Sequence, residues 1–343
     1  MKRGHLIVLA LIIVAMMPRP LVGAQEQAET VALRFAVLAP RGSIWHRVLS
    51  AWGNTLRAQT QGRLTLHIEV ATPGDEPALA ARLRRGELDG GCFTAVGLGA
   101  IARPSLVLQA PGVFDGYEAL DRARAAMDAE LRRLFEDEGA TLVGWSDFGR
   151  ARIFATYPIA RPADFRGHRA WVLPGDPIAP AFFGVVGAAP VPLPLSEVRS
   201  ALEARRVDTV IASASAASAL QWHTLITHVT RQSDAVLVGG ILFAKPRVDA
   251  LPPDLQQALR DTGRQAAETL NRAVRRADAR YFETLPGSNG ITLVDASAYT
   301  EEWRRAAQQA RERLVGTVYS RELLARALAA GQGPAQRAAG LTQ

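Results

Sequence analysis

VALRFAVLAPRGSIWHRVLSAWGNTLRAQTQGRLTLHIEVA, residues 31–71, is the stretch that decides the fold. Its β-branched and apolar start, 31–39, predicts a strand, which the sequence Pro-Arg-Gly-Ser then ends. A helical pattern over 44–60 stops at Gly62, and residues 63–71 place leucine, isoleucine or valine at every second position, as a half-buried strand does. Strand, helix and strand in this order indicate a mainly parallel sheet covered by helices.

The same alternation of helices and strands continues along the chain. The strands expected after this stretch are short and apolar: 90–96, 141–145, 152–155, 171–173, 189–191, 209–212 and 236–243. The helices expected around them are 77–85, 117–138, 177–186, 195–205 and a long one over 253–285. We therefore predict an α/β protein whose ligand lies beyond the carboxyl ends of its parallel strands.

The first 24 residues predict a secretory signal peptide. Two basic residues precede an apolar run over 6–17, and a Val-Gly-Ala sequence suited to signal peptidase precedes Gln25. The run is shorter than the roughly 20 residues that a membrane-spanning helix needs. The single cysteine, Cys92, is far from this site, so we expect neither a lipid anchor nor an intramolecular disulfide. A soluble periplasmic protein is the expectation.

The positive charge of the chain does not indicate a nucleic-acid partner. The formal charge of +7 at pH 7 falls to +4 when the signal segment, with its three basic residues and no acidic one, is removed. The remaining arginines are mixed with acidic residues on predicted helices and are not interleaved with aromatic residues. We therefore expect no nucleic acid among its partners.

Short motifs follow one another in a fixed order through most of the chain. They are PRGSIW at 40–45, RGELD at 85–89, PGVF at 111–114, PADFRG at 162–167, GAAPVPL at 187–193 with SEV at 196–198, the segment 201–208, and LPP at 251–253. In this order they resemble the substrate-binding proteins of TRAP (tripartite ATP-independent periplasmic) transporters, over residues 31–315. The resemblance implies a two-lobed periplasmic-binding-protein fold in which a long helix bridges the lobes, a small-molecule ligand in the cleft, and membrane permease subunits as partners.

The lobe boundaries follow from the predicted strands. We expect the chain to leave the first lobe near Gly149 and to return to it with the strand 236–243. The resulting division is a signal peptide at 1–24, lobe I at 25–149 and 238–277, lobe II at 150–237 and 278–330, and a disordered tail at 331–343.

Two positions depart from the pattern of the family that the chain resembles. Most members carry an arginine that pairs with the ligand carboxylate where this chain has Trp171, and a polar contact, commonly asparagine, falls at Ala212 and Ser213. Loss of such a charge-assisted pair removes about 1.5–3 kcal/mol of carboxylate binding. Tryptophan offers a flat apolar face instead, and Leu195 aligns with a position close to the ligand. We expect a substantially apolar ligand.

An alternative keeps a carboxylate ligand. In that case Trp171 packs into the lobe core, and one of Arg150, Arg152 or Arg169 takes over the missing contact. The further ligand contacts that we expect from lobe I are Trp45, Phe93 and Thr94.

The sequence gives little support for an enzymatic function. GLGAIA at 97–102 matches the G-x-G-x-x-A pattern of dinucleotide-binding enzymes, but it does not lie in the first strand-to-helix turn. Serine-hydrolase, zinc-protease and phosphate-loop motifs are not found in the sequence. We therefore predict a binding protein with no catalytic residues, cofactor or metal. An alternative function, of another class, is that of an envelope scaffold or lipid-handling partner that has lost its role in transport.

Overall fold

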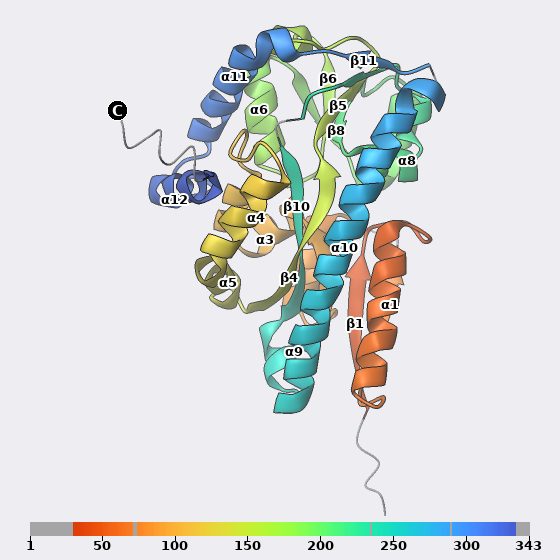
Figure 1. Cartoon of the computed structure of the whole chain (residues 1–343), viewed down its shortest axis with the longest axis vertical. Helices are drawn as coiled ribbons and strands as arrows, with labels where there is room; N and C mark the ends of the chain where they lie inside the picture. Colours follow the sequence, from red (N-terminus) through yellow and green to blue (C-terminus); the bar gives the residue numbers. More distant parts are fainter. Residues whose placement is uncertain (1–29, 71–73, 234, 289, 334–343) are drawn as a thin grey trace, which may run out of the picture.

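The computed structural model describes residues 30–70, 74–233, 235–288 and 290–333, which form two α/β lobes (Figure 1). The predicted signal peptide and the part of the predicted tail from residue 334 on lie outside the described residues. None of the helices in the described ranges is long and apolar enough to cross a membrane.

Lobe I is built on a five-stranded sheet in the order β2-β1-β3-β10-β4. Its strands are β1 (Val31–Val37), β2 (Leu64–Val70), β3 (Gly90–Thr94), β4 (Ala140–Arg150) and β10 (Val236–Ala244). Strand β1 is parallel to β2 and β3, whereas β10 is antiparallel to both β3 and β4. One buried apolar cluster fills each face of this sheet, as expected for a sheet that helices cover on both faces.

Lobe II is built on a six-stranded sheet in the order β11-β9-β5-β8-β6-β7. Its strands are β5 (Arg152–Ala155), β6 (Arg169–Val172), β7 (Ala189–Pro192), β8 (Thr209–Ala212), β9 (His228–Thr230) and β11 (Thr292–Val294). Strand β6 is parallel to β7 and β8, and β9 is parallel to β11, whereas β5 is antiparallel to β8 and β9. The chain thus passes from one sheet to the other between Arg150 and Arg152.

Helices cover both sheets. In lobe I they are α1 (Ile44–Gln59), α2 (Glu76–Arg84), α3 (Ala95–Ile101), α4 (Tyr117–Ala126), α5 (Asp128–Glu136) and α9 (Lys245–Asp249). In lobe II they are α6 (Ile178–Val186), α7 (Val198–Glu203), α8 (Ala214–Ala219) and α11 (Thr300–Arg313). Short 3₁₀ helices are η1 (Arg103–Gln109), η2 (Pro162–Phe165), η3 (Leu195–Glu197), η4 (Trp222–Thr224) and η5 (Ser297–Tyr299). The last helix, α12 (Arg321–Gly331), returns to lobe I and packs on α4.

The long helix α10 (Pro253–Ser288) contacts both lobes, as predicted (Figure 1). It packs on α1 and β4 of lobe I and on α8 of lobe II. The buried carboxylate of Asp278 accepts hydrogen bonds from the backbone N–H groups of Arg150, at 2.9 Å, and of Ser215, at 3.0 Å. Because Arg150 ends strand β4 of the lobe I sheet and Ser215 lies in α8 of lobe II, Asp278 ties the crossing strand, α8 and the long helix together.

Gly149 makes this close approach possible. Its φ of +103° lies in the region that favours glycine, and a Cβ atom there would come within 2.5 Å of the Ser213 Cβ and 2.8 Å of the Asp278 Cγ. The crossing between the lobes is therefore tightly packed.

Three predicted elements differ from the structure. The expected helix 117–138 is divided at Met127. The Met127 N–H donates the last hydrogen bond of α4, to the Ala123 carbonyl oxygen, and the Met127 side chain is buried in the core of lobe I. The expected helix 195–205 is the 3₁₀ turn η3 followed by the shorter α7. Strand β4 extends well past the predicted 141–145 because β10 pairs with it over Ala140–Arg150.

Candidate functional site

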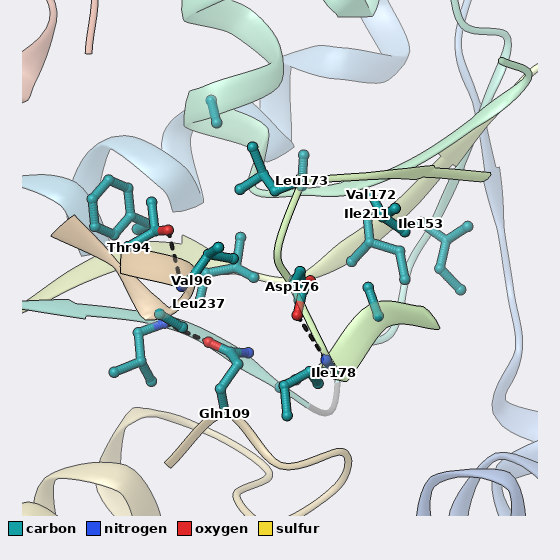
Figure 2. Close-up of a pocket in the computed structure, with 18 of the residues that line it drawn as sticks. Thr94, Val96, Gln109, Ile153, Val172, Leu173, Asp176, Ile178, Ile211 and Leu237 are labelled. Carbon is teal, nitrogen blue, oxygen red and sulfur yellow. Dashed lines mark hydrogen bonds between the residues drawn. The ribbon is translucent and has the colours of Figure 1, made fainter. Parts of the chain in front are cut away.

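A cavity of about 780 Å³ lies between the lobes (Figure 2). Most of the side chains that line it are apolar. From lobe I these include Trp45, Val96, Phe148 and Leu237, and from lobe II Ile153, Trp171, Val172, Leu173, Leu195 and Ile211. A site of this size and character suits a small organic molecule with extensive apolar surface.

The topology of the two sheets positions these residues. Val37, Thr94, Val172 and Ala212 are the last residues of β1, β3, β6 and β8, and all four line the cavity. Parallel strands present their carboxyl ends at one edge of a sheet, so a cleft between two such edges collects strand ends from both lobes. Thr94 also begins α3, because its Oγ1 accepts a hydrogen bond from the N–H of Val96 at 3.3 Å (Figure 2).

Tryptophans form part of the wall in each lobe. In lobe I, Trp45 stacks on Phe148 with ring centroids 5.2 Å apart, and its buried Nε1 has no hydrogen-bond partner among the described residues. In lobe II, Trp171 packs edge-on against Trp222 at 5.2 Å and donates its indole N–H to the Leu193 carbonyl oxygen at 2.9 Å. Trp171 therefore belongs to the lobe II core and to the cavity wall at once.

Two carboxyl groups in the wall have raised pKa values. Glu76, the first residue of α2, is 2% exposed and accepts hydrogen bonds from the Thr94 N–H at 3.2 and 3.3 Å, and burial raises its pKa to about 7. Asp176 accepts a hydrogen bond from the Ile178 N–H at 2.7 Å, and burial raises its pKa to about 6 (Figure 2). The sequence pattern did not single out either residue as part of the site.

Five of the residues predicted to contact the ligand line the cavity and five do not. Those that line it are Trp45, Thr94, Trp171, Leu195 and Ala212. Those that do not are Phe93, Arg150, Arg152, Arg169 and Ser213. Phe93 is fully buried in the lobe I core, and the Ser213 hydroxyl caps α8 by accepting from the Ala216 N–H.

None of the three predicted arginines lines the cavity, and each has partners within the protein, although the two acceptors of Arg150 belong to residues of the cavity wall. Arg150 donates to the backbone carbonyl groups of Asp115 and Ser233. The guanidinium of Arg152 lies 3.4 Å from the centre of the Phe282 ring and donates to the backbone carbonyl of Arg231. Arg169 is exposed and forms an ion pair with Asp208 at 3.5 Å. These contacts direct all three guanidinium groups to other parts of lobe II and its junction with lobe I.

Helix α11 supplies a part of the wall that sequence reasoning missed. Thr300, Trp303, Arg304, Ala307 and Arg311 line the cavity from one face of this helix. Their spacing of three or four residues is the signal that could have revealed a common face. The Trp303 ring stacks on Phe182 of α6 at an interplanar angle of 15°, so α11 is fixed against lobe II.

The two lobes touch beside the cavity. Gly175, in lobe II, has a φ of +80°, and a Cβ atom at this position would lie 2.8 Å from the Cγ of Pro77 in α2 of lobe I. The side chain of Ile178 in lobe II also joins the apolar cluster of lobe I. Glycine at 175 therefore allows the lobes to meet at this contact.

Comparison with known proteins gives consistent results. The family model of bacterial extracellular solute-binding proteins, family 7, matches residues 35–317. The 2,3-diketo-L-gulonate-binding periplasmic protein YiaO of Escherichia coli (strain K12) is 25% identical over 282 residues, which cover 79% of this chain and 84% of that protein.

Solved structures share the fold. A TRAP periplasmic solute-binding protein from Sulfitobacter sp. NAS-14.1 with bound β-D-galacturonate has a TM-score of 0.78 and 16% identity, covering 88% of this chain and 99% of that one. A Bordetella pertussis extracytoplasmic solute receptor binding pyroglutamic acid has a TM-score of 0.81 and 16% identity, covering 89% and 100%. The predicted architecture of two α/β lobes and a long helix is confirmed.

Proposed function

The chain belongs to the bacterial extracellular solute-binding proteins of family 7, and from this premise we propose that it captures a substantially apolar organic molecule between its lobes for a TRAP transporter. The molecule would be handed to the membrane permease subunits of that transporter. A periplasmic location, after cleavage of residues 1–24 and without a lipid anchor, is part of this proposal.

The apolar lining of the cavity carries the proposal of an apolar ligand. Trp45, Phe148, Trp171, Leu195 and Ile211 supply aromatic and aliphatic wall from both lobes. A ligand that buries about 300 Å² of apolar surface gains roughly 7 kcal/mol at about 25 cal/mol per Å², before the entropy of association is subtracted. A few polar groups then suffice to orient it.

The alternative of a carboxylate held by Arg150, Arg152 or Arg169 has less support. Relatives of known structure carry sugar acids and pyroglutamate, so the family accommodates carboxylates. In this chain, however, Trp171 stands where the family pattern places the pairing arginine. The three arginines do not line the cavity, and they already donate to backbone carbonyl groups or pair with Asp208. A small acid would cover little of the apolar wall, so its binding would gain little from the burial of apolar surface.

Capture would proceed by closure of the lobes. The links between them include the strand crossing at Arg150–Arg152, strand β10 and the long helix α10, which together form a compact hinge region. A ligand that contacts both walls binds the closed arrangement better than the open one and so shifts the population toward it. No covalent step is involved, and an envelope scaffold would be recognised instead by co-purification of a partner other than a permease.

Substitution of Trp171 tests the site. The Trp171→Phe variant removes about 40 Å² of apolar surface and the N–H, so affinity for the molecule released from the wild-type protein should fall about fivefold. Trp52→Phe is the matched control, because Trp52 is also buried and donates its N–H to the Thr262 hydroxyl but does not line the cavity. An equal loss of ligand affinity in the two variants, measured by calorimetric titration, would show that Trp171 does not contact the ligand.

A further inference from the structure

The cavity extends from the tryptophan-lined cleft to the face of α11, at the edge where lobe II meets the loop Pro111–Gly112 of lobe I. Arg311 on α11 donates through Nη1 to the Pro111 carbonyl oxygen at 2.7 Å. Gly112 has a φ of +64°, and a Cβ atom there would lie 2.9 Å from the Cβ of Ala307. This end of the cavity is therefore closed by direct contact between the lobes.

Each of the three acidic residues of the cavity wall can either become neutral by protonation or remain charged in contact with solvent. Burial raises the pKa of Glu76 to about 7 and that of Asp176 to about 6, so both carboxyl groups can take up a proton near neutral pH. Asp115 is exposed, so solvent stabilises its charge. None of the three requires a cationic ligand group for neutralisation.

The two arginines of the wall differ in how their charge is compensated. Arg304 is largely exposed and pairs with Glu301 on the same helix. Arg311 is half-buried, makes no ion pair with a carboxylate in the described ranges, and has a buried Nε without a hydrogen-bond partner there. Burial lowers the pKa of Arg311, but a guanidinium stays protonated in proteins. Arg311 therefore keeps its positive charge, whereas the buried carboxyl groups can become neutral by taking up a proton.

We infer that Arg311 binds an anionic group, a carboxylate in the simplest case, of a ligand whose apolar body lies against the tryptophan-lined part of the cavity. The inference rests on the proposed function and narrows its ligand class to apolar molecules with one anionic end. A carboxylate beside the part of the guanidinium that faces the cavity supplies the negative charge that no carboxylate in the described ranges supplies. Because Nη1 already holds Pro111 of lobe I, the same contact stabilises the closed arrangement.

Octanoate and octanamide are suitable probes, because they share an apolar chain and differ in the charge of the end group. Calorimetric titration at pH 7.5 is carried out with the mature protein and with the variants Arg311→Gln, Arg311→Lys and Arg305→Gln. The last is the matched control, since Arg305 lies on the same helix and is exposed but does not line the cavity. Thermal unfolding of each variant establishes that it is folded.

The wild-type protein should bind octanoate at least about tenfold more tightly than octanamide, as expected for a charge-assisted hydrogen bond. Arg311→Gln should abolish this preference, Arg311→Lys should retain part of it, and Arg305→Gln should leave it unchanged. Equal affinity of the wild-type protein for both probes, or an equal loss for both in Arg311→Gln, would overturn the assignment of Arg311 alone. Failure of both probes to bind the wild-type protein would overturn the proposal of an apolar ligand as well.

Discussion

The buried carboxyl group of Glu76 should make the stability of the protein depend on pH. In the unfolded chain a glutamate titrates near 4.5, whereas burial in the cavity wall raises the pKa of Glu76 to about 7. The folded protein therefore holds this proton at pH values where the unfolded chain has released it. The free energy of unfolding should fall as pH rises from 4.5 to about 7, by about 3 kcal/mol at 1.36 kcal/mol per pH unit.

Glu76→Gln removes the titrating proton and keeps an acceptor for the Thr94 N–H. Relative to the wild-type protein, this variant should therefore gain stability steadily across the same pH interval. Urea unfolding at several pH values between 4 and 8 measures the difference. Glu118→Gln is the control, because the Glu118 side chain is 96% exposed. A difference between wild type and Glu76→Gln that stays constant with pH would refute the reasoning.

Three further substitutions test the packing between the lobes. Gly149→Ala should lower the free energy of unfolding by at least about 2 kcal/mol. The control Gly139→Ala also has a positive φ but open space around it, and should lower the free energy of unfolding by about 1 kcal/mol. Similar losses for the two variants in urea unfolding would contradict the crowding at the crossing. Gly175→Ala should hold the lobes apart at Pro77 and raise the radius of gyration in X-ray scattering, and an unchanged radius would speak against this contact. Asp278→Asn should lower the free energy of unfolding by about 1–3 kcal/mol in urea unfolding, because two backbone N–H groups lose a charged acceptor. An unchanged free energy of unfolding would show that Asp278 does not hold the lobes and the long helix together.

The elements of the sheets could be predicted because their signals are local. The alternation at 63–71 and the glycine that follows the helix 44–60 determine β2 and α1 within two residues. The break at Met127 was missed because the side chains on either side of it continue a helical pattern. Only the packing of α4 and α5 on different neighbours requires the chain to bend there.

Three of the five predicted residues that line the cavity follow from strand topology, whereas Trp45 and Leu195 lie outside the strands. Thr94, Trp171 and Ala212 end or nearly end parallel strands, so their places in the cavity follow from topology. Glu76 and Arg311 could not be found in this way. Their places in the wall depend on how α2 and α11 pack against distant parts of the chain, and helix periodicity alone does not give that packing.

Native mass spectrometry of the protein purified from the cells that produce it tests the central claim most directly. Denaturation then releases the bound molecule for identification. We expect one small molecule per chain with an extended apolar body, held less tightly by Trp171→Phe. A dicarboxylate or sugar acid without an apolar portion would contradict the proposal that the tryptophan-lined cavity selects apolar ligands.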